Sequence, residues 1–114
     1  MGGVPLTFIK DEEVEQALFW LSDHACKAAQ ARADKLYLEA YSKVLLAQIM
    51  KEHPSLGVAA QEREAHSDPR YLMHLKGLRE AHINDHKMSW LKASMEAKIE
   101  AWRTMNATER AMKL

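Results

Sequence analysis

The chain has 114 residues, of which 47% are hydrophobic and 28% charged, so its composition is that of a folded protein with one domain, residues 1–114. Sixteen Lys and Arg residues balance sixteen Asp and Glu residues, and the zero formal charge excludes a strongly basic protein that coats nucleic acid. A single cysteine excludes an intrachain disulfide and favours a reducing compartment. Because no run approaches the roughly 20 apolar residues of a membrane span and no signal peptide is visible, we expect a cytoplasmic protein.

The pattern of residues predicts an all-α fold. Alanine is abundant and β-branched residues are few, which favours helices over strands. The first long helix is expected over about residues 11–52, and the acidic residues 11–13 and 15 suit the positive end of its dipole. No Gly or Pro interrupts residues 6–53, whereas an irregular start is expected up to Pro5.

The connector is expected over residues 53–68. Pro54 removes a backbone donor and should end the first helix, and residues 58–65 can form a short helix. Asp68 can cap the next helix, with Pro69 at its first position. The last long helix is therefore expected over about residues 69–110, which makes the fold a long helical hairpin.

Apolar residues recur at steps of three and four along both long helices, which predicts one buried face on each. In the first helix this face is Val14, Leu18, Leu21, Ala25, Ala29, Ala33, Leu36, Ala40, Val44 and Ala47. In the last helix it is Leu72, Leu75, Leu78, His82, Met88, Leu91, Met95, Ile99 and Trp102. The other sides carry Phe19, Trp20, Tyr37, Tyr41, Leu45, Ile49, Trp90 and Leu114. Two helices cannot enclose so much apolar surface, and we expect a homodimer that forms a four-helix-type bundle. The alternative is a monomer whose middle segment folds back over the hairpin.

Two histidines form the best candidate for a metal site. His82 and His86 are four residues apart and share one helix face, a spacing that can hold a metal ion. Asp85 stands between them, but the spacing specifies no third ligand. We therefore expect no bound metal, and take a polar patch or a buried histidine as the simpler interpretation.

Catalytic motifs are not found. His24 and Cys26 do not face one another on a helix, so they do not make a base and a nucleophile. The sequence has no glycine-rich phosphate loop, no Cys pair at metal-site spacing and no Gly-x-Ser-x-Gly. We expect a protein that is not an enzyme and carries no cofactor.

Charge is distributed unevenly along the chain. Residues 1–65 hold seven basic and ten acidic residues, whereas residues 66–114 hold nine basic and six acidic residues. A basic surface with an aromatic side chain can contact phosphates and stack a base, and the candidate nucleic-acid-binding residues are Lys87, Trp90, Lys92, Arg103 and Arg110. A solvated helix face is the alternative interpretation. In a third, the acidic N-terminal part of one chain meets the basic C-terminal part of another.

Three stretches carry a resemblance to a known group of proteins. They are Gln61-Glu62-Arg63-Glu64-Ala65, Ser67-Asp68-Pro69-Arg70-Tyr71 and Ala97-Lys98-Ile99-Glu100-Ala101-Trp102-Arg103. Together they resemble a family of small helical proteins of tailed bacteriophages and prophages, whose genes often lie near recombination and replication genes. The resemblance covers about the last 60 residues and implies a phage origin and a role beside DNA-processing proteins in the bacterial host.

These stretches also have a structural interpretation. Tyr71 and Leu72 would pack against the turn, and Trp102 would close the hairpin near the start of the first helix. The polar residues 62–64 would hold the connector through ion pairs.

The leading functional hypothesis is a non-enzymatic phage accessory protein. It would be a helical dimer that binds DNA or a DNA-processing protein. The alternatives are a host-directed inhibitor or adaptor that binds one bacterial protein, and a component of virion assembly.

Overall fold

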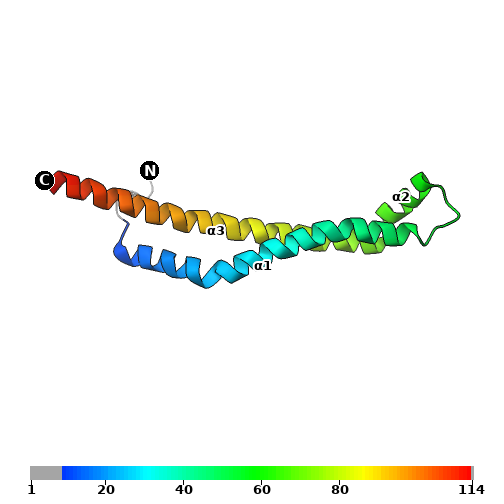
Figure 1. Ribbon diagram of the computed structural model, residues 1–114, viewed down its shortest axis with the longest axis horizontal. Coiled ribbons are helices and arrows are strands. Elements are labelled where there is room, and N and C mark those ends of the chain that lie inside the picture. Colours follow the sequence, from blue (N-terminus) through cyan, green and yellow to red (C-terminus); the bar gives the residue numbers. More distant parts are fainter. Residues whose placement is uncertain (1–8, 114) are drawn as a thin grey trace, which may run out of the picture. The chain divides into compact units, whose positions relative to one another are not determined.

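Three helices and no strand make up residues 9–113, the part of the chain that the structure, a computed structural model, describes. They are α1 (Asp11–Met50), α2 (Val58–Ser67) and α3 (Pro69–Lys113), as Figure 1 shows. The predicted all-α hairpin is thus confirmed. The predictions for Pro5 and Leu114 fall outside the described residues.

The chain packs as two compact units. Unit 1 comprises Met1–Ala28 and Lys87–Leu114, and unit 2 comprises Ala29–His86. In each unit, a segment of α1 pairs with an antiparallel segment of α3. The prediction of one domain for the whole chain stays a prediction.

The ends of α1 follow the sequence signals closely. Acidic residues fill the first turn, and the backbone N–H of Lys10 donates to Oε1 of Glu13 at 3.5 Å. The helix ends at Met50, two residues before the predicted end. There the backbone N–H groups of Glu52 and His53 donate to carbonyls three residues earlier, so the last turn tightens before Pro54.

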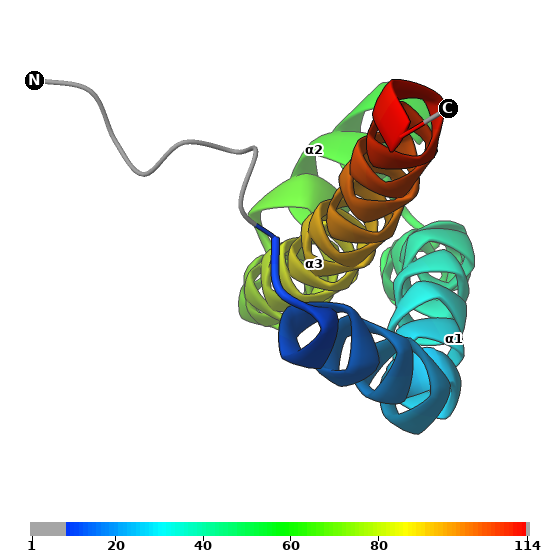
Figure 2. The ribbon, with the colours of Figure 1, turned by 90° about the vertical axis from the view of Figure 1, so that its left-hand side faces the viewer.

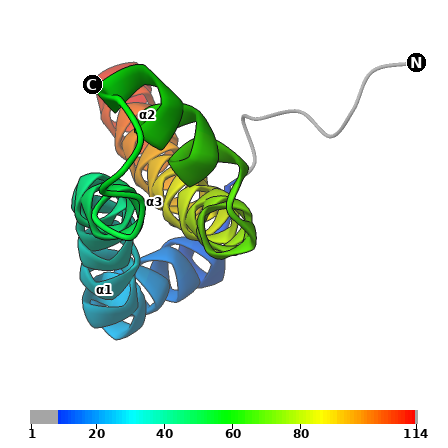
Figure 3. The ribbon, with the colours of Figure 1, turned by 90° about the vertical axis from the view of Figure 1, so that its right-hand side faces the viewer.

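The predicted short helix and the restart signal are both confirmed. The α2 helix runs two residues beyond its predicted end, and the backbone N–H of Arg70 donates to Oδ1 of Asp68 at 2.8 Å, which caps α3. Pro69 occupies the first position of α3. The loop that leaves α1 leads to α2, and α2 leads back to the first turn of α3 (Figure 3). The last helix reaches Lys113, three residues past the predicted end, because no Gly or Pro stops it.

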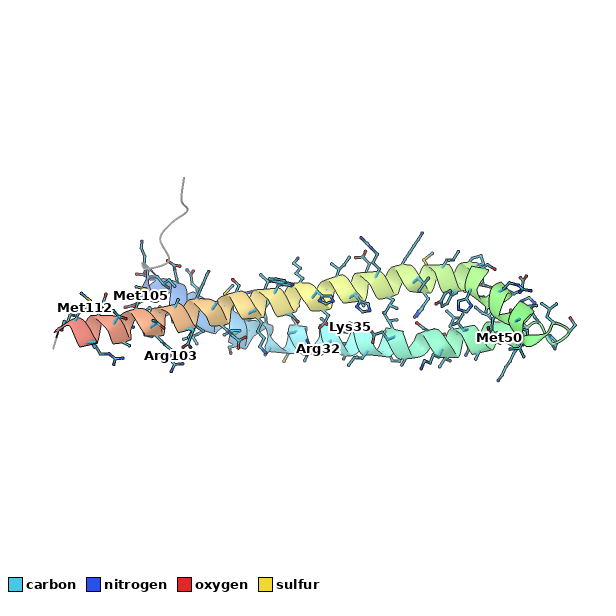
Figure 4. All side chains as sticks on the ribbon, turned by 90° about the horizontal axis from the view of Figure 1, so that it is seen from above. Arg32, Lys35, Met50, Arg103, Met105 and Met112 are labelled. Carbon is cyan, nitrogen blue, oxygen red and sulfur yellow. The ribbon has the colours of Figure 1, made fainter. Side chains whose placement is uncertain are left out.

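Unit 2 has its best-packed region beside the connector. Leu45, Ile49 and Ala65 are buried together, and Tyr71 packs against them. Ala65 brings α2 onto α1 with a side chain small enough for close approach. The predicted packing of Tyr71 at the turn is confirmed, whereas Leu72 is 49% exposed. Met50 lies at this end of the unit (Figure 4).

The buried face of α1 in unit 2 differs from the predicted one. Six of its buried and half-buried positions recur at alternating steps of three and four, the spacing of a coiled-coil seam. They are Ala31, Lys35, Leu38, Ser42, Leu45 and Ile49, and the half-buried Tyr41, Leu46 and Met50 lie beside this seam. The facing positions of α3 are Tyr71, His74, Leu78, Ala81 and Asp85. The predicted face of α1, from Ala29 to Ala47, is exposed instead. The prediction counted only apolar residues, whereas this seam includes polar residues that pair across it.

Unit 1 has a thinner core than unit 2. Val14 and Ala17 are its buried hydrophobic residues, and the remaining seam positions are half-buried. These half-buried positions are Leu21, His24, Ala28, Met88, Leu91, Met95, Ile99 and Trp102. The five on α3 match the predicted face. The indole N–H of Trp102 donates to Oδ1 of Asp11 at 2.8 Å and so joins α3 to the start of α1, where Trp102 was predicted to lie. Figure 2 views α1 from its first turn, drawn in blue.

Within the described residues, no helix is long and apolar enough to pass through a membrane.

Candidate functional site

A buried carboxylate stands in the seam of unit 2. Asp85 on α3 is 4% exposed, and the Lys35 ammonium of α1 lies 3.0 Å from Oδ2. Arg32 on α1 places Nε 3.4 Å from Oδ1 (Figure 4). The hydrogen bond from Lys35 holds the pKa of Asp85 below its ordinary value, because it stabilises the charged form. This cluster joins α1 to α3 and fixes which residues face each other.

Sequence reasoning missed the partners of this carboxylate. The signal was present, because Lys35 falls at a seam position of α1 and Asp85 at one of α3. Each residue is a charged side chain in an otherwise apolar pattern. Two such side chains of opposite charge on antiparallel helices can form an ion pair.

A second polar layer lies nearer the connector. The Ser42 hydroxyl of α1 lies 2.7 Å from Nε2 of His74 on α3 and 3.2 Å from the carbonyl oxygen of Leu38. The His74 ring lies between Tyr41 and Tyr71, with ring centroids 5.6 and 6.4 Å away. The seam of unit 2 therefore has two specific polar contacts as well as apolar packing.

The candidate metal ligands share a helix face but lack a third ligand. The rings of His82 and His86 stack with centroids 6.2 Å apart, and Nε2 of His82 lies 3.0 Å from Oε1 of Glu39. No group of three or more His, Cys, Asp or Glu residues that could hold a metal ion is found in the described residues. The carboxylate of Glu39 thus pairs with the imidazole of His82 alone.

The candidate nucleic-acid-binding residues lie in unit 1 but on different sides of α3. Lys92, Arg103 and Arg110 follow one another at steps of eleven and seven residues, which keeps them on one side of the helix. Trp90 is 76% exposed, and at 100° per residue it points about 200° away from Lys92. Lys87, three residues before Trp90, is the candidate cation on the same side as the indole.

The basic C-terminal part of α3 carries an open hollow. Arg103, Arg110 and Lys113 line it together with Glu100 and Glu109, so cations and carboxylates alternate there. Arg103 projects from α3 (Figure 4) and lies 3.4 Å from Glu100. This surface is charged, but it is not uniformly basic.

A shallow apolar groove separates the helices of unit 1. Trp20, Leu21, His24, Ala25 and Ala28 of α1 line it, and Lys92 of α3 closes its edge. The Trp20 and His24 rings stack 4.3 Å apart. Small side chains opposite Lys92 leave this part of the seam open.

The connector is held by a fork of hydrogen bonds from Arg70. Its two terminal nitrogens each lie 2.8 Å from an oxygen of Glu52, and Nη2 also lies 3.0 Å from Oδ2 of Asp68. Both carboxyl groups have a lowered pKa, chiefly because of these hydrogen bonds from Arg70. Gln61 adds a bond from its amide to the carbonyl of His53 at 2.8 Å.

Ion pairs of residues 62–64 were expected to hold the connector, and this prediction is not confirmed. Among the described residues 9–113, no ion pair is found for these three exposed side chains. The connector is held instead by Arg70 and Gln61, which belong to the stretches that resemble the phage proteins.

The outward face of α1 in unit 2 departs from that of an ordinary solvated helix. Leu36, Tyr37 and Val44 are 54, 67 and 48% exposed. Ala33 and Ala40 lie beside them, also exposed. In a two-helix pair these positions face water and are expected to be polar.

No family model, no curated protein and no solved structure matches this chain. The resemblance to phage proteins therefore stays a prediction.

Proposed function

We propose that the protein is a non-enzymatic helical adaptor that acts by binding other polypeptides, further copies of itself included. The observation that carries this proposal is the distribution of hydrophobic side chains. Six hydrophobic residues are buried, whereas thirteen large ones are exposed in the described part of the chain. Large apolar surfaces that a chain leaves exposed are typical of interaction sites.

The charge distribution favours a polypeptide over nucleic acid as the partner. Residues 1–28 carry two basic and five acidic residues, and residues 87–114 carry six basic and three acidic residues. Both segments belong to unit 1, so the charge asymmetry along the chain is balanced within one unit. A neutral unit gains little from the release of counterions that drives binding to phosphates.

Two features favour binding over catalysis. The hollows are open depressions on helix surfaces, whereas catalytic sites are typically concave pockets. The described groups with a shifted pKa are Glu52, Asp68, Arg70 and Asp85, and each takes part in an ion pair. Their charges serve to join helices.

Nucleic acid is the second candidate partner, because Trp90 is largely exposed next to Lys87. An indole beside a cation can stack on a base of a single strand. This surface would act beside DNA-processing proteins, as the resemblance to phage proteins implies.

Light scattering with and without a DNA oligomer tests the proposal. We expect a mass above the 13.0 kDa of one chain, and no change when a single- or double-stranded oligomer is added at about 50 mM salt. A mass of 13.0 kDa at all protein concentrations, together with no binding to another polypeptide, would contradict the adaptor proposal. DNA binding that weakens as salt rises and is lost on Trp90→Ala would favour the second candidate instead.

A further inference from the structure

The outward face of α1 in unit 2 carries no charge over nineteen residues. Its positions are Ala29, Ala33, Leu36, Tyr37, Ala40, Val44 and Ala47, and we call these seven residues the outer stripe. All are exposed, and they lie opposite the seam that α1 forms with α3. Apart from the adjacent pair Leu36 and Tyr37, they recur at steps of three and four, so they lie along one side of the helix.

The corresponding face of α3 in the same unit is different. Lys76, Arg79 and Glu80 stand among its exposed positions, and Arg79 and Glu80 pair at 3.2 Å. That face has the charges expected of a helix in contact with water. Leu72, Leu75 and Ile83 are exposed on α3 as well, so its outward face mixes apolar and charged residues, whereas the outward face of α1 carries no charge.

We infer that the outer stripe is the interface with a second copy of this chain, and that the two α1 helices pack antiparallel with Ala40 of each copy on the twofold axis. This inference deepens the proposed function, on which it rests. Ala33, Ala40 and Ala47 are seven residues apart, so their small side chains fall on one line and let two helices approach to about 8 Å. Leu36 and Val44 then fill the spaces between the alanines.

The self-complementary pattern of the stripe favours the antiparallel direction. With Ala40 on the axis, Ala33 of one copy lies level with Ala47 of the other, and Leu36 lies level with Val44. Ala33, Ala40 and Ala47 then meet alanines and Leu36 meets Val44, whereas Tyr37 lies level with Lys43 of the other copy and Ala29 with Lys51. An isologous contact of this kind closes at two copies and leaves no free end.

The charged residues beside the stripe support the same direction. Glu39 and Lys43 lie on one flank, because they are four residues apart. In the antiparallel pair, Glu39 of one copy and Lys43 of the other differ in height by about 3 Å, at 1.5 Å per residue. In a parallel pair in register, this flank would instead face the opposite flank of the other copy, where Gln30 and Gln48 lie, and Lys43 would not meet Glu39. Glu39 also lies 3.0 Å from His82 of its own chain.

Disulfide trapping tests this arrangement. Cys26 is exposed and is first replaced by Ser, and single cysteines then replace Ala33, Ala40 or Ala47. The folded, full-length proteins are oxidised in solution. Because a disulfide needs Cβ atoms about 4 Å apart, we expect Ala40→Cys to form a covalent dimer about tenfold faster than Ala33→Cys or Ala47→Cys alone. A mixture of Ala33→Cys and Ala47→Cys should form the mixed dimer. Ala93→Cys, at an exposed alanine of α3, is the matched control and should stay uncoupled.

The outcomes separate the inference from the proposed function. Equal self-coupling at all three positions would show a parallel pair and overturn the inference. A protein that is dimeric by light scattering but couples at none of them would overturn it too, while the proposed function would remain. A protein of 13.0 kDa that binds no polypeptide would contradict both.

Discussion

Lys35 and Asp85 meet across the seam of unit 2, with the ammonium nitrogen 3.0 Å from Oδ2 and the carboxylate side chain 5% exposed. Both residues interrupt apolar patterns, and each one makes the other acceptable in the interior. The pair fixes the register of α1 on α3, and so decides which face of α1 points outward.

Asp85→Asn should destabilise the protein, because Lys35 would keep its charge at a seam position without a carboxylate. We expect the Tm to fall by about 5–10 °C at pH 7, measured by circular dichroism. Glu80→Gln, at an exposed carboxylate of the same helix, should change the Tm by less than about 2 °C. Equal effects of the two variants would contradict the role of the seam pair.

The contribution of Asp85 should also depend on pH. Its folded pKa is lowered from the ordinary value of 3.8, so the stabilisation is fully present above that value. It is lost as the pH falls through the lower, folded pKa. The difference in Tm between the wild type and Asp85→Asn should therefore be constant from pH 5 to pH 7 and shrink below about pH 3.8. A difference that grows on acidification would contradict this assignment.

Arg70 should not be replaceable by lysine. Its fork reaches both oxygens of Glu52 at 2.8 Å, and an ammonium group cannot reproduce that geometry. We expect Arg70→Lys and Arg70→Ala to lower the Tm by similar amounts, about 2–4 °C at low salt and less at 1 M salt. A lysine variant with the wild-type Tm would show that charge alone is sufficient.

Ile49→Ala tests the position of the seam. Ile49 is fully buried, and its truncation should lower the free energy of unfolding by about 3 kcal/mol in urea titrations. Leu56→Ala, in the exposed connector, should change it by less than about 0.5 kcal/mol. An Ile49→Ala protein with the unfolding free energy of the wild type would contradict the described packing of α1 against α2 and α3.

Gly77→Ala should stabilise the protein. An added Cβ at Gly77 meets no atom within 4 Å, and alanine is favoured over glycine in a helix interior by about 1 kcal/mol. Gly57, which precedes α2 in extended backbone, serves as a control, since alanine gains little there. Destabilisation by Gly77→Ala would indicate that another chain approaches the backbone of α3 closely at this point.

Much of the fold could be predicted because its signals are local. Asp68 and Pro69 define a helix start by their own backbone chemistry, and Pro54 defines the end of the preceding helix. The place of Trp102 beside the start of the first helix was predicted because an antiparallel hairpin brings these ends together, whereas its bond to Asp11 was not.

Counting apolar residues could not predict which face of α1 is buried in unit 2. Alanines occupy its outward side, whereas Lys35 and Ser42 occupy the seam, so hydropathy alone selects the wrong face. The polar seam positions become acceptable only when Asp85 and His74 are known to lie opposite. That information is tertiary and is absent from any single helix.

The central claim is that the protein acts through polypeptide contacts made by the outer stripe of α1. Its most direct test is the mass of Ala40→Glu by light scattering, over about 1 to 100 µM protein, beside the wild type and the matched control Ala93→Glu. The account predicts a dimer for the wild type and for Ala93→Glu, and a mass of 13.0 kDa for Ala40→Glu. An Ala40→Glu protein that keeps the mass of the wild type, or a wild type of 13.0 kDa throughout, would contradict it.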